Sequence, residues 1–284
     1  MDWPVLAIVA LVLFGFSRIL YIRASAQYAV PEEKFLKSLY LAGLLTMSPL
    51  IILERRELSL GNIYAGIILS MLSVAGSLAM YRAVALSSPS MVNVIVGLNF
   101  LMPLIVGLVA LQEKLTYIQL LGLALALITI ALSMIIDIKY SIRDEENGRA
   151  TRRGIVYAFV TFFTWGMLGI LVKAMYISNI LNSIPQCLWA MYLSGLAVLY
   201  LIHRGVEAQG MSRLGIAAGV LSSLGSYLVT LCYAVGEISV TALITRFSYL
   251  LPAVYSLATS CEKASPLKIL VIVLSVISLI LLSY

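Results

Sequence analysis

Apolar runs long enough to cross a lipid bilayer follow one another along almost the whole chain. Hydrophobic residues make up 62% of its 284 residues, charged residues only 11%, and the mean hydropathy is +1.03. A soluble domain is about half apolar and about a quarter charged. A helical span needs about 20 mostly apolar residues. By this measure the sequence predicts ten spans, at 3–22, 35–53, 61–86, 90–111, 115–137, 154–178, 183–202, 213–235, 239–260 and 266–284.

These spans are expected to be helices. Backbone polar groups cannot stay unpaired in lipid, so only helices and closed barrels cross a membrane. The alternating ten-residue strands that build a barrel are not evident. The connecting segments are short and leave no room for a sizeable soluble domain. The predicted fold class is therefore an all-α membrane protein.

Two stretches of the chain share a sequence pattern and lie 149 residues apart (252 − 103 and 262 − 113). Pro103 stands ten residues before Glu113, Pro252 stands ten residues before Glu262, and a lysine follows each glutamate. A repeat of about half the chain length indicates that one structural unit has been duplicated.

A polar stretch at 139–153 separates five predicted spans from five. Since five is odd, equivalent points of the two halves fall on opposite sides of the membrane. We therefore predict ten transmembrane helices arranged as two inverted five-helix repeats, residues 1–138 and 154–284, joined by this linker. Inverted repeats are a common construction of secondary transporters.

The sequence around Glu113 and Glu262 favours a structural role for these residues over a catalytic one. Thr116 and Gln119 match a capping box that starts the fifth span, and a Ser-Pro pair starts the tenth. A carboxylate close to a helix start is stabilised by the positive end of the helix dipole. We expect both glutamates to stabilise helix ends.

A proline followed by Glu-Lys at a helix start, repeated in two five-span halves, resembles the EamA-type branch of the drug/metabolite transporter superfamily. Trp165-Gly166 with Lys173 in the sixth span also fits this pattern. Gly15-Phe16 with Arg23 is the corresponding motif in the first span. The resemblance covers essentially the whole chain. It implies a ten-helix exporter or exchanger of small metabolites in the plasma membrane, with a central cavity between the halves.

Small residues at four-residue spacing predict close helix packing within the spans. Gly66 and Ser70 stand at this spacing in the third span, and Gly215 and Gly219 in the eighth.

Four basic residues lie at least four residues away from either end of a predicted span: Arg18, Arg82, Lys173 and Arg246. Ionisable groups in lipid are costly and are therefore functional candidates. The first three lie roughly 6–8 Å from a span end at a rise of 1.5 Å per residue, where a long side chain can also reach the interface. Arg246 lies about 10 Å deep, and no carboxylate is found deep in any span.

Polar side chains recur on the same helix faces as these cations, although serine stripes also serve simple helix packing. Stripes run along the third span (Ser70, Ser73, Ser77, Tyr81) and the eighth (Ser222, Ser226, Thr230, Tyr233). The predicted substrate-binding residues are Arg246, Tyr249, Thr245, Arg82, Tyr81, Arg18, Asn93, Trp165, Gln186 and Trp189.

The function predicted is a secondary transporter of a small anionic or zwitterionic metabolite, such as an amino acid, working by alternating access. A translocator or flippase for a phosphate-bearing substrate (a sugar phosphate, a nucleotide sugar or an isoprenoid-phosphate-linked sugar) shares the fold and remains the alternative. A membrane enzyme acting on lipids is disfavoured, because no HExxH, P-loop or nucleophile–base pair is readable. We expect no cofactor, metal or nucleic acid, and a monomer or homodimer in the bilayer.

The orientation of the chain is left open by the sequence. Lysines and arginines number 12 in the loops facing away from the two termini and 3 in the loops on the side of the termini. The positive-inside rule then places both termini outside the cytoplasm, whereas the family resemblance implies that both are inside.

Overall fold

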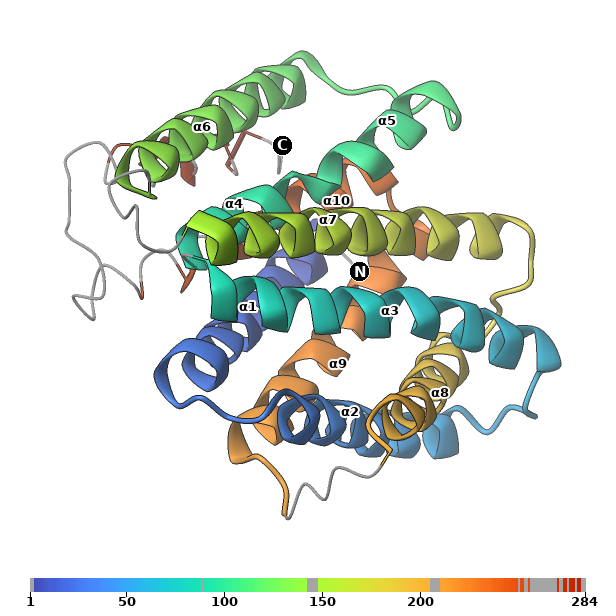
Figure 1. The fold of residues 1–284 in the computed structure, drawn as a ribbon. Coiled ribbons are helices and arrows are strands. Elements are labelled where there is room, and N and C mark those ends of the chain that lie inside the picture. The colour runs from blue at the N-terminus through green and yellow to red at the C-terminus, as the bar shows by residue number, and fades with distance from the viewer. Residues whose placement is uncertain are drawn as a thin grey trace.

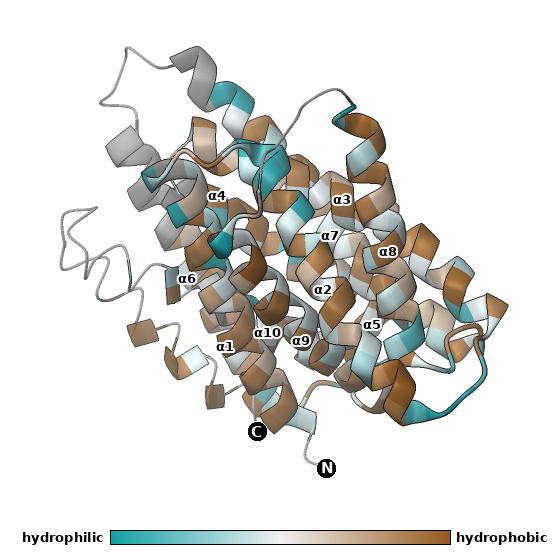
Figure 2. Ribbon diagram, turned by 90° about the horizontal axis from the view of Figure 1, so that it is seen from below, coloured by the Kyte–Doolittle hydropathy of each residue, from teal (hydrophilic) through white to brown (hydrophobic). Residues whose placement is uncertain are grey.

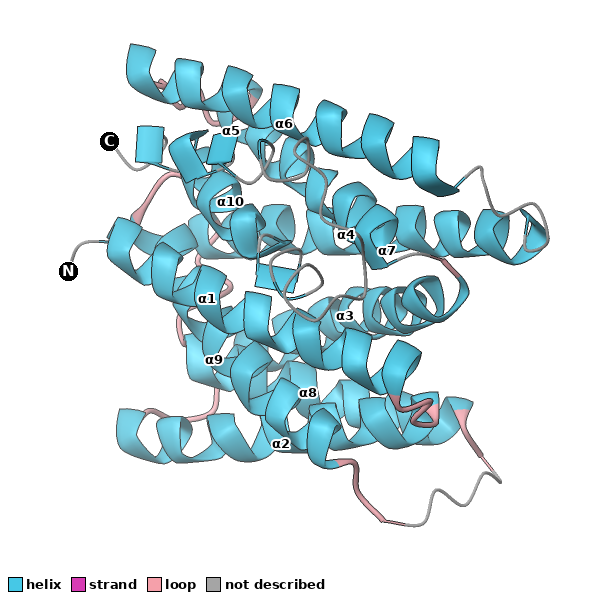
Figure 3. Cartoon of the chain, turned by 90° about the vertical axis from the view of Figure 1, so that its left-hand side faces the viewer, coloured by secondary structure: helices cyan, strands magenta, loops and turns pink. Residues whose placement is uncertain are grey.

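The computed structural model describes residues 3–87, 89–141, 148–204, 210–249, 251–252, 255, 270, 273–274, 276–278 and 280–281. Within these residues the chain consists of helices and short connections, without a β-strand (Figure 3). Six helices are long and apolar enough to span a membrane, and two shorter apolar stretches, Ile95–Val109 and Tyr117–Thr129, accompany them. Apolar residues predominate along the helices (Figure 2). The all-helical membrane fold is therefore confirmed.

The helices follow one another along the chain in the order shown in Figure 1. They are α1 (Trp3–Ile22), continued by a π-helical turn at Arg23–Gln27, α2 (Glu32–Glu54), α3 (Leu60–Leu86), α4 (Pro89–Gly97), α5 (Leu101–Val109), α6 (Tyr117–Ser141), α7 (Gly148–Ile177), α8 (Ile184–Ile202), α9 (Arg213–Val235) and α10 (Ile238–Arg246).

The span predicted at 90–111 is not one continuous helix. It consists of α4 and α5, which are joined by a 3₁₀ turn at Leu98–Phe100. The span predicted at 239–260 begins as α10 and a second 3₁₀ turn at Phe247–Tyr249. Most of the rest of this span lies outside the described residues, and so does most of the span predicted at 266–284. Cys261 and Glu262, between the two spans, also lie outside the described residues.

Several helix boundaries recur at the same offset of 149 residues as the sequence repeat. The helices α4 and α10 each contain 9 residues and start at Pro89 and Ile238. Each runs into a 3₁₀ turn of 3 residues. The helices α3 and α9 end at Leu86 and Val235, again 149 positions apart. Pro103 and Pro252 are both buried in helical backbone.

The two halves are intertwined by reciprocal helix contacts. The helix α3 packs against α7 and α8 of the second half, and α9 packs against α1 and α2 of the first. Glycines permit the closest approaches. A Cβ on Gly66 would lie 2.4 Å from the carbonyl oxygen of Cys187, and one on Gly215 would lie 2.5 Å from that of Phe35. The predicted small-residue packing is thus present between the halves.

A second reciprocal contact joins α2 to α8. The ring of Tyr192 lies against Gly43, and the ring of Tyr40 lies against Gly195. The two tyrosine rings meet edge to face with centroids 5.6 Å apart, which is a favourable arrangement of aromatic pairs. In the sequence, Tyr40-Leu-Ala-Gly43 and Tyr192-Leu-Ser-Gly195 are the two segments that make this contact.

Candidate functional site

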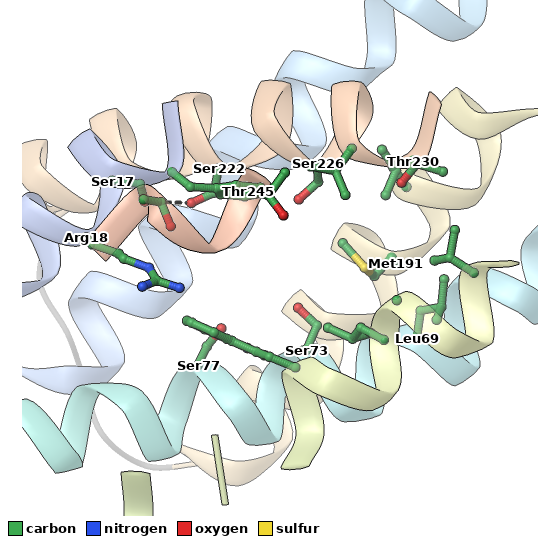
Figure 4. Close-up of a pocket in the computed structure, with 18 of the residues that line it drawn as sticks. Ser17, Arg18, Leu69, Ser73, Ser77, Met191, Ser222, Ser226, Thr230 and Thr245 are labelled. Carbon is green, nitrogen blue, oxygen red and sulfur yellow. Dashed lines mark hydrogen bonds between the residues drawn. The ribbon is translucent and has the colours of Figure 1, made fainter. Parts of the chain in front are cut away.

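A cavity of about 180 Å³ lies among six of the helices, with α1, α3, α7, α8, α9 and α10 supplying most of its wall (Figure 4). Its lining residues are Phe14, Ser17, Arg18, Tyr21, Leu39, Leu69, Ser73, Ser77, Trp165, Leu168, Gly169, Val172, Leu188, Met191, Tyr192, Ser222, Ser226, Val229, Thr230, Tyr233, Thr245, Arg246 and Ser248. Both halves of the chain therefore contribute to one mixed polar and apolar site.

Hydroxyl groups from matching positions of the two halves line this cavity. Ser73 and Ser77 come from α3, and Ser222 and Ser226 come from α9, in each case 149 residues later. The Tyr40 hydroxyl lies 2.7 Å from Ser73 Oγ. Serines at one-turn spacing on each helix explain why these stripes face the same space.

Arg18 projects into the cavity from α1. Its side chain is almost completely buried, with 6% of the residue exposed, and its guanidinium lies 5.9 Å from the ring centroid of Trp165. The neighbouring Ser17 Oγ is 2.7 Å from Ser222 Oγ. In the described part of the chain, Nη1 of Arg18 has no hydrogen-bond partner. The cation-π contact alone does not replace the water that this group gives up.

Arg246, the last residue of α10, faces the same cavity. A side-chain hydrogen bond joins it to Tyr233, and its Nε has no hydrogen-bond partner among the described residues. The C-terminal end of a helix carries a partial negative charge that favours a cation. The end of α10 therefore helps to accommodate this charge, but it leaves Nε unpaired among the described residues.

Arg18 and Arg246 both line this cavity, so two positive charges share one small space. None of the described residues that line the cavity is an aspartate or a glutamate. Like charges in a poorly solvated space destabilise each other, and an anion bound between them would relieve this repulsion. The geometry and charge of the site therefore suit a carboxylate or a phosphate, which arginine binds through paired hydrogen bonds.

Of the predicted substrate-binding residues, the structure brings Arg246, Thr245, Arg18 and Trp165 together at the cavity. Of the eight residues in the two predicted polar stripes, six line it as well, namely Ser73, Ser77, Ser222, Ser226, Thr230 and Tyr233. The side chain of Tyr249 lies outside the described residues.

Four other predicted residues lie away from the cavity lining. Arg82 forms an ion pair with Glu32, with Nε 3.0 Å from the carboxylate, and its side chain is 43% exposed. Tyr81 donates its hydroxyl to the backbone carbonyl of Val30. Trp189 packs against the apolar core, and Asn93 is buried in α4. Each of them has a local packing or pairing role that its sequence position does not reveal.

Gln186 also lies away from the cavity, in a polar network at the N-terminal end of α8. Its Oε1 accepts hydrogen bonds from Asn62 Nδ2 at 2.9 Å and from the Ser59 backbone N–H at 3.0 Å. Its Nε2 donates to the Glu57 carbonyl at 2.9 Å. The fully buried Asn62 continues the network to Asn182. Gln186 therefore fastens the α2–α3 connection to the second half of the chain.

Several cavity residues were missing from the sequence-based prediction, namely Ser17, Tyr21, Met191, Tyr192 and Ser248. Ser17 adjoins Arg18, so a search one position to either side of each intramembrane cation would have found it. Met191 and Tyr192 come from an apolar run without a charge or a polar stripe. Only the reciprocal packing of α2 and α8 places them at the cavity.

The connection between α9 and α10 is held by two charged residues. The Lys173 ammonium donates to the carbonyl oxygens of Tyr233 at 2.9 Å and Gly236 at 3.0 Å, at the end of α9. Glu113 accepts from backbone N–H groups at the start of α10. Glu237 lies in this connection, and its pKa is raised above the ordinary value. Burial is the main cause and the negative charge of Glu113 is the second, whereas the positive charge of Lys173 opposes the shift. Lys173 therefore stabilises a helix end and does not face the cavity.

Residues 1–135 match the family model described as the EamA-like transporter family. The matched region carries α1, the serine stripe of α3, and the Pro103 and Glu113 motif. The first half of the chain belongs to the EamA-like transporter family. This agrees with the sequence motifs, which predicted an EamA-type membrane protein of the drug/metabolite transporter superfamily.

The fold of the whole chain is shared with a solved structure. A solved structure that carries only the description "Crystal structure of protein" is similar over 99% of this chain and 98% of its own, with a TM-score of 0.75. The sequence identity is 13%, so this similarity concerns the fold alone. No curated protein sequence matches the chain.

Proposed function

We propose that this protein is a secondary transporter that exports or exchanges a small anionic metabolite by alternating access. The observation that carries the proposal is the convergence of Arg18 and Arg246 on one cavity between the two halves, without a carboxylate among the described lining residues. A buried cation pair is unfavourable by itself and becomes favourable when an anion binds. Thr245, Tyr233 and the serines of α3 and α9 supply additional hydrogen bonds.

The proposed architecture is ten transmembrane helices in two inverted repeats, residues 1–138 and 154–284, linked through 139–153. The family model matches residues 1–135, which is nearly the first proposed repeat. The end of α3 and both ends of α4 recur in α9 and α10 at an offset of 149 residues. Reciprocal contacts of α3 and α9 with the opposite half support the same arrangement.

Alternating access follows from this architecture when one half rocks against the other around a fixed site. The cavity lies where α3 and α9 pack against the opposite half. The polar network of Asn62, Asn182 and Gln186 ties the halves together beside the α2–α3 connection, and we assign it as a closing contact on that side. Release of this contact would open the cavity there.

Energy coupling in this proposal comes from the substrate gradient or from exchange of one anion for another. A proton-coupled carrier needs an acid that binds the proton and the substrate in turn. Glu113 lies outside the cavity lining and accepts hydrogen bonds at the start of α10, and the described cavity lining contains no carboxylate. In line with the family resemblance, we place the protein in the plasma membrane.

A phosphate-bearing substrate is the second candidate. Two guanidinium groups on one wall suit a phosphate monoester, whose charge is about −1.5 to −2 at neutral pH. The same geometry accepts a carboxylate, so both anion types belong in the test.

The experiment is counterflow in liposomes that contain the purified full-length protein. Vesicles are loaded with one compound, and uptake of its radiolabelled form is measured against a panel of carboxylates, amino acids, sugar phosphates and nucleotide sugars. We expect exchange of one or more anions, abolished in Arg246→Ala and retained in Arg213→Gln, which removes an exposed cation at the start of α9. Exchange of organic cations alone, or equal exchange by Arg246→Ala, would overturn the proposal.

A further inference from the structure

The cavity has a charged end and an apolar end. Figure 4 shows Arg18 beside Ser17, Ser222 and Thr245 at one end, and Leu69, Met191 and Thr230 at the other. Leu69 precedes Ser77 on α3 by eight residues, or about 12 Å along the helix axis. The lining also includes Leu188, one helical turn before Met191, and Val229, which adjoins Thr230. The site therefore changes from cationic to hydrophobic along its length.

The asymmetry is stronger than the repeat alone would produce. The serine positions of α3 and α9 are the same in both halves. By contrast, the position that corresponds to Arg246 at the offset of 149 is Gly97, the buried last residue of α4. Duplication has thus kept the hydroxyl groups, but the cation stands on one side only. A substrate bound here is held in one orientation.

We infer that the site selects an amphipathic anion that lacks an ammonium group, with a carboxylate or phosphate headgroup on a short apolar body. This inference rests on the proposed transport function and names its substrate class. The headgroup binds between Arg18 and Arg246, and the apolar body extends toward Leu69 and Met191. Apolar surface moved out of water on this wall adds affinity without adding specificity for any polar group.

The ammonium group of an amino acid does not fit this arrangement. It is separated from the carboxylate carbon by one atom, so a carboxylate held by Arg18 and Arg246 brings the ammonium close to both guanidinium groups. No aspartate or glutamate among the described lining residues offsets that repulsion. Hydroxyl groups of the lining, such as those of Ser17 and Ser222, can accept a hydrogen bond from the ammonium group, but they carry no negative charge that would offset this repulsion.

A second charge at the far end of the substrate is also disfavoured. Leu69, Met191, Leu188 and Val229 offer no donor for it, and Thr230 offers a single hydroxyl without a positive charge. Burying a carboxylate without a cationic partner is costly. A compound with two charges is therefore accepted only if both lie on one headgroup, as in a phosphate monoester. A chain-terminal dicarboxylate should bind worse than the monocarboxylate of the same length.

The test uses four compounds that share one branched body: 4-methylpentanoate, leucine, 3-methylbutylamine and 3-methylbutyl phosphate. Each competes for counterflow and is also assayed for thermal stabilisation of the purified full-length protein. We expect the carboxylate, the phosphate ester or both to compete, leucine to be at least about ten-fold weaker, and the amine to have no effect. Shortening the carboxylate to butanoate and acetate should weaken competition by about three- to four-fold per lost methylene.

The outcomes separate the two proposals. Equal competition by leucine and 4-methylpentanoate would overturn the selection against an ammonium group and leave anion transport standing. Competition by none of the four, with an unrelated hydrophilic anion transported, would overturn the amphipathic class alone. Competition by 3-methylbutylamine alone would overturn both. Met191→Gln gives a second test. If the apolar body lies against that wall, the substitution should weaken competition by 4-methylpentanoate more than competition by acetate.

Discussion

The carboxylate of Glu113, which follows α5 in the first half of the chain, binds Ser239 in the second half. Its Oε2 accepts the Ser239 backbone N–H at 3.0 Å and also the Ser239 hydroxyl, and its Oε1 accepts the Ile238 backbone N–H at 2.9 Å. These N–H groups belong to the first turn of α10 and have no partner within that helix. The Glu-Lys motif of one half therefore fixes the helix that carries Arg246.

The first prediction concerns this helix start. Glu113→Gln should lower the free energy of unfolding by about 1–2 kcal/mol, because the amide loses the negative charge and one of the two acceptor atoms. Transport per folded molecule should remain within a few-fold of wild type. Thermal unfolding in detergent and counterflow normalised to folded protein measure the two effects. A stable Glu113→Gln variant with no transport would show that Glu113 is a coupling residue.

A substitution at Gly107 offers a related test that does not change Glu113 itself. A Cβ at this position would lie 2.5 Å from Glu113 Oε2 and 3.1 Å from Ile238 Cγ2. Gly107→Ala should therefore displace the carboxylate and destabilise the protein by about 1–3 kcal/mol. Combining it with Glu113→Gln should cost less than the sum of the two single changes, because both act on the same contact. Additive losses in thermal unfolding would contradict this.

A third prediction concerns Lys173, at the other side of the α9–α10 connection. Lys173→Met keeps the length of the side chain but removes the donor to the carbonyls of Tyr233 and Gly236. The loss should be about 1–2 kcal/mol of unfolding free energy, without a change in which anion is preferred. If Lys173→Met instead alters substrate preference at unchanged stability, Lys173 contacts the substrate.

The fourth prediction concerns Gln186, which the sequence placed in the substrate site. Gln186→Leu leaves the Ser59 N–H without its acceptor and should destabilise the protein by about 1–3 kcal/mol. The KM for the transported anion should change by less than about two-fold, since the side chain lies outside the cavity. Steady-state uptake and thermal unfolding distinguish these roles. A large rise in KM at unchanged stability would support the sequence-based assignment.

Much of the fold was predictable because lipid imposes long apolar helices, which hydropathy detects directly. The capping box of Thr116 and Gln119 was also predictable and is confirmed, with both reciprocal hydrogen bonds present. The partner of Glu113 was not. Local rules assign such a carboxylate to the next helix in sequence, whereas here it stabilises a helix that starts 125 residues later.

The sequence predicted those residues of the candidate site whose burial in lipid carries a large free-energy cost. Arg18 and Arg246 stand out in sequence because ionisable groups in lipid require compensation. Arg82 stands out for the same reason, but its partner Glu32 lies 50 residues away, and only the packing of α3 beside the start of α2 brings them together. Tyr192 and Met191 carried no signal, because an apolar residue at a cavity wall resembles any other core residue.

The most direct test of the account is substrate binding by the full-length protein with Arg246 altered. Thermal stabilisation and counterflow are measured for 4-methylpentanoate and 3-methylbutyl phosphate in wild type, Arg246→Lys, Arg246→Ala and the Arg213→Gln control. We predict that Arg246→Lys weakens binding by about ten-fold or more, because lysine cannot bind an anion through two parallel hydrogen bonds. Arg246→Ala should abolish binding, while Arg213→Gln behaves as wild type. Normal transport and stabilisation in a folded Arg246→Ala protein would contradict the anion site.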